Sequence, residues 1–302
     1  MSTSATWPAS SDIPVYCLST FNQAGQRPHH GFDLKVVEEL VEDFPFTHHP
    51  HRHDFYDLLF ITEGSGTHTI DFITYEVKPC SLFFLSPGQV HSWELSRDTK
   101  GFTLFFEPEF YLINRPTEAL RDLPFFHGFA SDPVLYLDCQ QHHNIRQILL
   151  NMQEEYQQEE QPRTYDILRA YLEVLLLKLS RFYQASQGPK PEASRYLRGL
   201  VHRFETLIDQ HFAEVKAVKD YADMLHTSPK NLNKICKQAV GKTASEMIQT
   251  RVVLEAKRML LHSDLAVAQV VDKLNFYDAS YFIKFFKKAT GMTPEQFRRA
   301  VQ

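Results

Sequence analysis

The last third of the chain contains the same helix-turn-helix pattern twice. The first copy covers residues 220–243 and the second covers residues 270–293, with Leu225 of the first corresponding to Leu274 of the second. Each copy has an apolar first helix, a short turn and a second helix that ends at a glycine. Two such units in succession can present two helices to one face of a DNA duplex. The repeat therefore predicts a protein that binds double-stranded DNA.

The distribution of charge along the chain agrees with this prediction. The whole sequence has a formal net charge of −5, but from residue 190 onward there are 19 lysines and arginines and 12 aspartates and glutamates, a net charge of +7. The preceding residues carry 13 basic and 25 acidic side chains, a net charge of −12. A basic module joined to an acidic domain is typical of a nucleic-acid-binding region with a partner domain.

The composition also indicates the cellular setting. The four cysteines lie far apart without a CxxC pair, which disfavours a zinc framework or a disulfide-stabilised fold and favours a reducing compartment. The N-terminal segment has no basic start followed by an apolar run, so we expect no secretory signal. The most apolar segment, residues 174–179, is too short to span a membrane. We expect a cytoplasmic protein without a membrane partner.

The N-terminal part of the chain, residues 1–140, has the pattern of a β-domain. Short segments rich in aromatic and β-branched residues alternate with turns that contain glycine or proline. The expected strands cover residues 55–61, 67–72, 81–85 and 101–106. This spacing predicts a small barrel or a two-sheet jelly roll.

The periodicity becomes helical at residues 141–186, where two amphipathic helices are expected on either side of Pro162. Consecutive leucines at positions 175, 176 and 177 widen the apolar face of the second helix. We therefore expect this helix pair to form a homodimer interface as well as to pack against its own domain.

A linker is expected at residues 187–194, because its glycine and prolines interrupt any helix and none of its residues could fill a core. Residues 195–302 then form an all-helical domain that contains the two helix-turn-helix units. The predicted fold class is α+β with several domains: a cupin-like barrel or jelly roll, a helical pair and an all-α module.

The second helix of each copy is expected to contact DNA. In the first copy, Ser228 and Pro229 suit the first positions of a helix and Gly241 suits its end. The apolar side chains of these helices point inward, so the lysines remain outside. Lysine and asparagine near a helix N-terminus can bond to base edges, whereas later lysines suit phosphates. The expected phosphate contacts are Lys237, Lys287 and Lys288.

Residues 280–298, SYFIKFFKKATGMTPEQFR, resemble the signature of the AraC/XylS family of bacterial transcription regulators. Arg251 and Ala256 resemble positions of that family's linker helix, and the resemblance extends over about residues 217–299. It implies that the two recognition helices enter successive major-groove segments on one face of the promoter. The base-facing residues that it implies are Lys230, Asn233 and Lys234 in the first copy, and Ala279, Ser280, Tyr281 and Lys284 in the second.

The resemblance also implies a function. We expect an effector-responsive, sequence-specific transcriptional regulator with a small organic effector in its N-terminal domain and no enzymatic activity. Activation through contact with RNA polymerase is expected, with repression as the alternative. The chain departs from the family pattern at three positions. Val271 stands where alanine is usual, Asn275 where glycine is usual and Cys236 where phenylalanine is usual. Asparagine tolerates a positive φ, so we expect the turn at Asn275 to form.

Histidines in the N-terminal domain raise an alternative. His51, His53, Asp57 and His91 resemble the two motifs of the cupin barrel, in which two histidines, an acid and a third histidine can ligate one metal. Strand alternation would place the first three on one face. Asp57 stands where a longer glutamate is usual, and regulators of this kind mostly bind an organic effector instead, so we expect no cofactor. The alternative is a metal-dependent cupin enzyme, a dioxygenase or isomerase, with a DNA-binding tail.

The expected effector site is lined by aromatic and histidine side chains of the β-domain. This composition suits a sugar or an aromatic acid that stacks on apolar walls and bonds to a few polar groups. The expected lining residues are Phe55, Tyr56, Leu58, Phe60, His68, Phe84, His91, Trp93 and Phe105.

Overall fold

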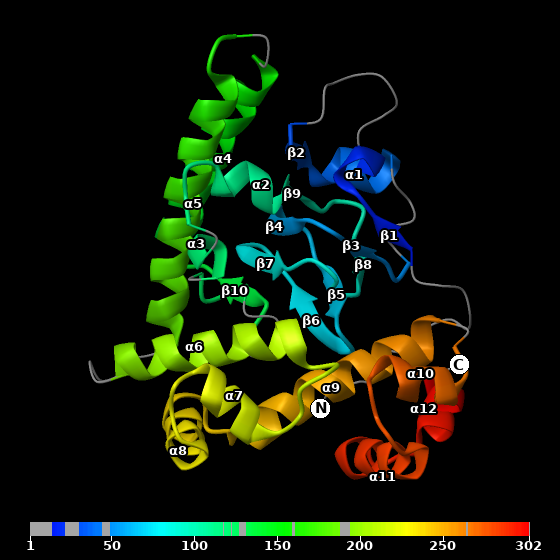
Figure 1. Ribbon diagram of the computed structural model, residues 1–302. Helices are drawn as coiled ribbons and strands as arrows, with labels where there is room; N and C mark the ends of the chain where they lie inside the picture. Colours follow the sequence, from blue (N-terminus) through cyan, green and yellow to red (C-terminus); the bar gives the residue numbers. More distant parts are fainter. Residues whose placement is uncertain are drawn as a thin grey trace. The chain divides into compact units, whose positions relative to one another are not determined.

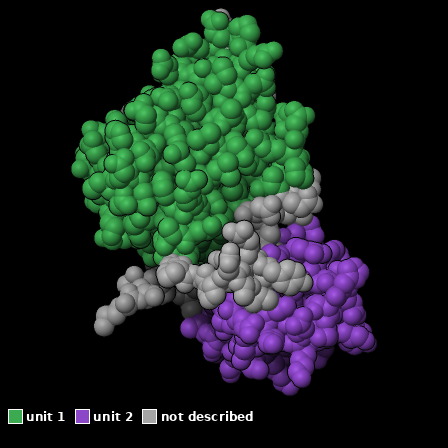
Figure 2. Space-filling view, turned by 90° about the vertical axis from the view of Figure 1, so that its left-hand side faces the viewer, with its two compact units in different colours: residues 1–5, 14–189 green, residues 6–13, 190–302 purple. Residues whose placement is uncertain are grey.

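The computed structural model describes residues 14–21, 30–43, 49–116, 118–121, 123–126, 131–158, 161–187, 194–263 and 265–301. These residues divide into two compact units, coloured separately in Figure 2. The first comprises the described residues up to 187, and the second comprises those from 194 onward. The expected linker, residues 187–194, lies mostly outside the described residues.

The first unit is built on antiparallel sheets, as predicted for the N-terminal domain. A five-stranded sheet has the order β10-β7-β4-β9-β2, and a three-stranded sheet has the order β6-β5-β8. The strands of the larger sheet are β2 (Phe32–Val36), β4 (Tyr56–Glu63), β7 (Ser81–Leu85), β9 (Lys100–Phe106) and β10 (Val134–Tyr136). Those of the smaller are β5 (Gly66–Ile70), β6 (Ile73–Val77) and β8 (His91–Leu95), while β1 (Val15–Tyr16) and β3 (Arg52–His53) form a separate parallel pair.

The central strand β4 is apolar on both faces because the five-stranded sheet is covered on both sides. Successive side chains of a strand point to opposite faces. Leu58 is paired with Phe84 and Leu104, and these three belong to a core shared with the helices that follow the barrel. The neighbouring Leu59 is paired with Phe83 and belongs to a second core, which also contains side chains of the three-stranded sheet. The layers of the first unit are therefore the three-stranded sheet, the core between the two sheets, the five-stranded sheet, the core shared with the helices, and the helices themselves.

The helical layer is an antiparallel pair, α4 (Cys139–Gln157) and α5 (Thr164–Ser186), which lie side by side in Figure 1. Helix α4 begins with a capping box. The side chain of Asp138 accepts from the backbone N–H of Gln141, and the side chain of Gln141 accepts from the backbone N–H of Asp138. The other helical segments of this unit are η1 (Leu18–Phe21), α1 (Val37–Asp43), α2 (Pro108–Leu112) and α3 (Glu118–Arg121).

The leucine run of α5 is divided between two environments. Leu175 and Leu176 are buried in the core of their own unit. Contrary to the prediction, they do not widen the exposed apolar face of the helix. Leu177 is 54% exposed, and Ile167 and Val174 share its side of the helix at 40% and 45% exposure.

Within the described residues, no helix is both long enough and apolar enough to cross a membrane.

The strands around the first hairpin of the smaller sheet differ from the sequence prediction. The segment expected as one strand over residues 67–72 ends at Ile70, because Asp71 and Phe72 form a two-residue hairpin turn with φ values of 45° and 72°. Such turns usually contain glycine or asparagine, and neither is present here. The following strand β6 and the histidine-bearing strand β8 were not predicted as separate strands.

The second unit is all-helical, as predicted. Its helices are α6 (Ser194–His211), α7 (Val218–Met224), α8 (Pro229–Val240), α9 (Ala244–His262), α10 (Val267–Lys273), α11 (Ala279–Thr290) and α12 (Pro294–Val301). The two helix-turn-helix units are α7 with α8 and α10 with α11, and α9 connects them.

The turns of the two repeats have equivalent backbone conformations. Asn275, where the sequence predicted a turn with a positive φ, has a φ of 52°. His226 has the same φ at the corresponding position of the first repeat. Ser228 caps α8 by accepting from the backbone N–H of Asn231, and Asp278 caps α11 by accepting from that of Ser280. Each recognition helix thus begins at a capped N-terminus with its first turn held in place.

Candidate DNA-binding surface and effector site

The first recognition helix, α8, separates its side chains by face. Leu232, Ile235 and Cys236 are buried and hold the helix against its domain. The buried Cys236 occupies the core position where the family usually has phenylalanine. Lys230, Lys234 and Lys237 are exposed on the opposite side, as the sequence predicted.

Asn233 has a different role from the expected base contact. Its amide nitrogen donates to the carbonyl oxygen of Pro229 at 3.1 Å, and its Oδ1 accepts from the backbone N–H of Ala244 at 3.0 Å. Ala244 is the first residue of α9, so this bond satisfies one of the unpaired N–H groups at that helix N-terminus. The structure therefore uses this side chain to join α8 to α9, which corrects its assignment as a base-facing residue.

The second recognition helix, α11, is anchored by Phe282 and Phe286, both of them fully buried. The six residues of this helix that were expected to contact DNA are all exposed: Ala279, Ser280, Tyr281, Lys284, Lys287 and Lys288. Tyr277, which the sequence did not single out, is fully exposed in the turn directly before α11, next to the exposed residues at the start of that helix.

Polar contacts fix the helices that carry the recognition helices. Arg251 of α9 donates to Asp209 at 2.7 Å and to Glu255 at 2.9 Å, and its guanidinium lies 3.9 Å from the centre of the Phe212 ring. Arg298 of α12 donates through Nε to the carbonyl oxygen of Leu260 at 2.9 Å. These two arginines belong to the family-like segments of the sequence, and the structure gives both a scaffold role.

A buried carboxyl group lies in the same domain. Glu205 of α6 is 5% exposed, and burial, reinforced by the negative charge of Asp209, raises its pKa to about 8. Glu205 is therefore protonated at neutral pH and adds no negative charge to this basic unit.

The interior of the first unit lies between the two sheets and combines aromatic with polar side chains. Of the expected effector-site residues, Phe55, Trp93 and Phe105 belong to the core between the sheets, and His68 and His91 contact the aromatic rings of that core. Tyr56, Leu58, Phe60 and Phe84 pack instead with the core beneath α4 and α5. These four assignments are corrected, because strand alternation turns them to the opposite face of the five-stranded sheet.

The N-terminal segment of the described chain packs against this interior. Strand β1 pairs with β3 through Tyr16 and His53, and the ring of Tyr16 lies 5.7 Å from that of His51. Phe21 of η1 is buried and packs edge-on against Phe55, with ring centres 5.7 Å apart. A side chain from outside the barrel strands therefore completes the aromatic lining.

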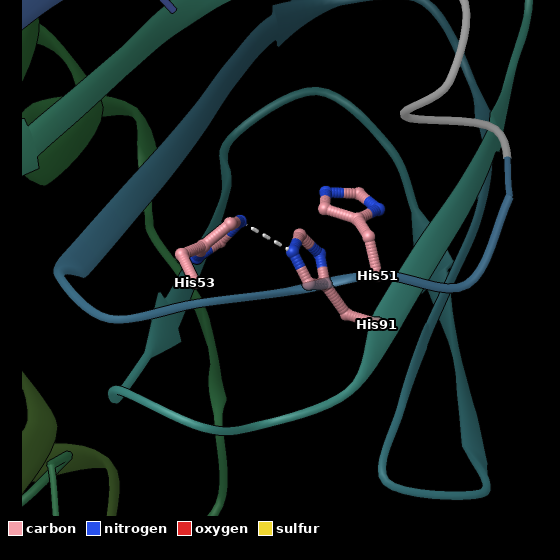
Figure 3. Close-up of side chains that lie close together, drawn as sticks. All are labelled: His51, His53 and His91. Atoms are coloured by element: carbon pink, nitrogen blue, oxygen red, sulfur yellow. Dashed lines mark hydrogen bonds between the residues drawn. The ribbon is translucent and has the colours of Figure 1, made fainter. Parts of the chain in front are cut away.

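Three of the four residues with cupin-like spacing come together. His51, His53 and His91 are buried, and each offers one ring nitrogen within 4.8 Å of the others. Figure 3 shows His91 between the other two rings. Its Nε2 lies 2.7 Å from Nε2 of His53, and its Nδ1 lies 3.0 Å from Nε2 of His68.

Asp57, the fourth expected member, is not part of this group. It is completely buried, and its Oδ1 accepts from the hydroxyl of Thr103 at 2.8 Å. Its Oδ2 is buried and has no hydrogen-bond partner among the residues that the structure describes. Burial raises the pKa of Asp57 to about 7.

Burial also controls the protonation of the histidines. It lowers the pKa of His51 to about 4 and that of His68 to about 3. It lowers the pKa values of His53 and His91 well below their usual range, and the neighbouring histidines add to the effect. All four rings are therefore neutral at physiological pH, and each retains one nitrogen lone pair.

Comparison with known proteins agrees with both parts of this geometry. A model of the AraC-like ligand binding domain matches residues 42–176, and a helix-turn-helix domain model matches residues 221–300. The HTH-type transcriptional activator RhaR of Escherichia coli (strain K12) is 25% identical over 251 residues, which cover 82% of this chain and 86% of RhaR. RhaR of Cronobacter sakazakii is 24% identical over 254 residues. The chain belongs to the AraC family of transcription regulators.

Solved structures match the chain with low TM-scores. ToxT of Vibrio cholerae with a bound unsaturated fatty acid is 14% identical, covers 90% of this chain and gives a TM-score of 0.41. The C-terminal domain of AraT from Geobacillus stearothermophilus is 27% identical, covers 33% of this chain and gives a TM-score of 0.32.

Family membership assigns the two units their functions. The second unit, with two helix-turn-helix repeats, binds DNA, and the first is the ligand-binding domain. This AraC-family protein is an effector-responsive transcriptional regulator, and the RhaR proteins that it resembles are transcriptional activators.

Proposed function

We propose that the chain recognises promoter DNA through exposed side chains of both recognition helices. The observation that carries this proposal is the segregation of α8 and α11 into a buried apolar face and an exposed face with lysines. We assign base contacts to Lys230 and Lys234 on α8, and to Tyr281 and Lys284 with the small residues Ala279 and Ser280 on α11. Lys237, Lys287 and Lys288 lie further along the helices and suit phosphate contacts.

The two helices differ in the chemistry they offer to a base. α8 presents two lysines in its first two turns, which can donate to guanine acceptors in the major groove. α11 presents mainly small side chains there and one lysine. We propose that α8 supplies most of the sequence preference and that α11 mainly anchors the protein.

We propose that the effector is a small organic molecule, of the sugar or aromatic-acid class, that binds between the two sheets. Phe55, Trp93 and Phe105 supply apolar rings, and the unpartnered Oδ2 of Asp57 supplies a polar group without a protein partner. Because side chains fill this interior, an entering effector must displace some of them. Phe21 is the candidate, since it comes from a segment outside the barrel strands.

This effector assignment predicts stabilisation of the full-length protein by a matching ligand. A ligand that binds only the folded state stabilises it by about 2.7 kcal/mol at 100 times its dissociation constant. Thermal unfolding in the presence of sugars and aromatic acids should therefore identify compounds that raise the midpoint. Asp57→Asn should reduce that shift, whereas Asp98→Asn, at an exposed turn, should not. If no compound of either class raises the midpoint, the assigned effector class is wrong.

We propose that the regulator is a homodimer held through α5. Ile167, Val174 and Leu177 are exposed and lie at intervals of seven and three residues, the spacing with which two helices pack along an apolar seam. A second copy of the chain would cover this stripe. Effector binding would then act by shifting the population of the dimer that fits paired promoter sites.

We further propose that the bound dimer activates transcription by contacting RNA polymerase, in the cytoplasm where promoter DNA is located. Activation is supported by the relatives, which are activators. The enzyme alternative has no such support, since the matching relatives are regulators. We therefore propose that the barrel binds ligands without turnover.

A further inference from the structure

We propose that the barrel interior binds one divalent transition-metal ion through the imidazoles of His51, His53 and His91. The sequence alone favoured a site without metal, with Asp57 as a fourth ligand in the alternative. The structure instead brings together three histidines and excludes Asp57 from the group. This inference concerns the barrel alone and does not depend on the DNA-binding proposal.

The backbone fixes the three ligand positions. His51 and His91 face each other in an isolated antiparallel bridge, in which each backbone N–H donates to the other's carbonyl oxygen at 3.0 and 2.9 Å. The carbonyl oxygen of His53 accepts from the backbone N–H of Gly88 at 2.8 Å. Main-chain bonds therefore hold all three positions before any metal binds, which reduces the ordering that binding requires.

Two of the three rings are oriented by outer partners. Nδ1 of His51 lies 2.8 Å from the carbonyl oxygen of His49. A carbonyl only accepts, so Nδ1 carries the proton and Nε2 keeps its lone pair. Nδ1 of His91 can donate in the same way to Nε2 of His68, 3.0 Å away, and Nε2 of His91 then faces the ligand group. Metal-binding histidines are usually held by such a second hydrogen bond.

His68 is therefore a positioning residue and not a ligand. It is completely buried, and its Nδ1 has no hydrogen-bond partner within the described part of the chain. When His68 accepts from His91, its own proton must reside on that unpartnered Nδ1. The hydrogen bond from His91 to His68 directs the lone pair on Nε2 of His91 toward His51 and His53. It leaves the N–H at Nδ1 of His68 without a hydrogen bond, which costs free energy.

Metal binding requires local adjustments of the rings, because the three ligand nitrogens, which lie within 4.8 Å of one another, must reach the closer and even spacing of one coordination shell. Two nitrogens that ligate one tetrahedral ion at about 2.0–2.1 Å lie about 3.4 Å apart. Nε2 of His53 and Nε2 of His91 are 2.7 Å apart and share a hydrogen bond. The ion would replace that bond, the proton on Nε2 of His53 would pass to Nδ1 of the same ring, and these two nitrogens would separate by less than about 1 Å.

The ligand set selects the class of ion. Three imidazoles suit Zn²⁺, Fe²⁺, Co²⁺, Ni²⁺ or Cu²⁺ and disfavour Mg²⁺ and Ca²⁺, which prefer oxygen. Three protein ligands leave at least one coordination position free. An oxygen atom of the effector could occupy that position, so the ion would serve as a polar anchor among the aromatic side chains.

The test is a titration of the untagged full-length protein, first treated with a chelator, with Co²⁺ as the probe. Tetrahedral Co²⁺ with nitrogen ligands gives strong visible absorption, so its intensity reports coordination directly. We expect one Co²⁺ per chain and displacement by Zn²⁺. His53→Ala or His91→Ala should weaken binding by more than about 100-fold, and His68→Ala by about 10–100-fold.

The matched control is His49→Ala. It removes an exposed imidazole but keeps the main-chain carbonyl that orients His51, so binding should be unchanged. X-ray absorption of the Co²⁺-loaded unaltered protein gives a result that does not depend on any variant folding, and it should show a shell of imidazole nitrogens. No stoichiometric binding, a shell without imidazoles, or binding that persists in a folded His91→Ala protein would overturn the proposal. None of these outcomes bears on DNA binding.

Discussion

Replacing Lys234 with alanine should weaken binding of the full-length protein to its specific DNA site by about 1–3 kcal/mol, roughly 5- to 150-fold. Lys234 is exposed on α8 between the buried Leu232 and Ile235, which hold the helix in its domain. Removal of its side chain therefore eliminates a contact without disturbing the fold. The site is selected from random duplexes with the unaltered protein, and affinity is measured by fluorescence anisotropy.

The pattern of the loss distinguishes base from phosphate contacts. Lys234→Ala should relax the selected sequence at one position. Lys287→Ala should weaken binding equally to all sequences and reduce the slope of log affinity against log salt by about 1. Lys219→Ala, on the exposed surface of α7 outside both recognition helices, is the matched control. An unchanged affinity and sequence preference in Lys234→Ala would show that this lysine does not contact bases.

Introducing acidic residues on α5 should separate the dimer. Val174 and Leu177 are 45% and 54% exposed in the single chain and would be covered by a second copy. The double variant Val174→Glu/Leu177→Glu places charges in an apolar seam and opposite one another. We expect the dimer dissociation constant to rise by at least about 100-fold, on the order of 3 kcal/mol. Sedimentation velocity over a range of concentrations measures this change.

Ile73→Glu provides the control for the α5 variant. Ile73 is 56% exposed at the start of β6, in the three-stranded sheet and not in the helical layer, so its substitution should leave the association unchanged. A monomeric unaltered protein would contradict the proposed interface. So would a double variant that remains dimeric with the same dissociation constant.

The recognition helices could be predicted closely because their signals are local. Ser228, Gly241 and Gly291 mark helix ends through their own backbone and side-chain chemistry, and the structure places each of them at a cap. Asn275 follows the same logic, with its φ of 52°. Asn233 could not be assigned from sequence, because the N–H group that it bonds belongs to Ala244, eleven residues further along the chain.

The barrel was harder to predict because its central sheet is buried on both faces. In β4, apolar Leu58 and Leu59 point to different cores, so hydrophobicity alone could not identify the inner face. That ambiguity explains why Phe60 and Phe84 were assigned to the effector site. The histidine spacing was informative, but the contact between His68 and His91 depends on the pairing of β5 with β8, a register that the sequence does not show.

The most direct test of the account is a nuclease footprint of the full-length protein on the duplex selected from random sequence. Two recognition helices from one chain should enter successive major-groove segments, about 10 base pairs apart on one face of the DNA. We predict two protected segments with that spacing in each bound half-site, and loss of one in Lys230→Ala/Lys234→Ala. Uniform protection without sequence preference, or a single protected segment, would contradict recognition by both helices.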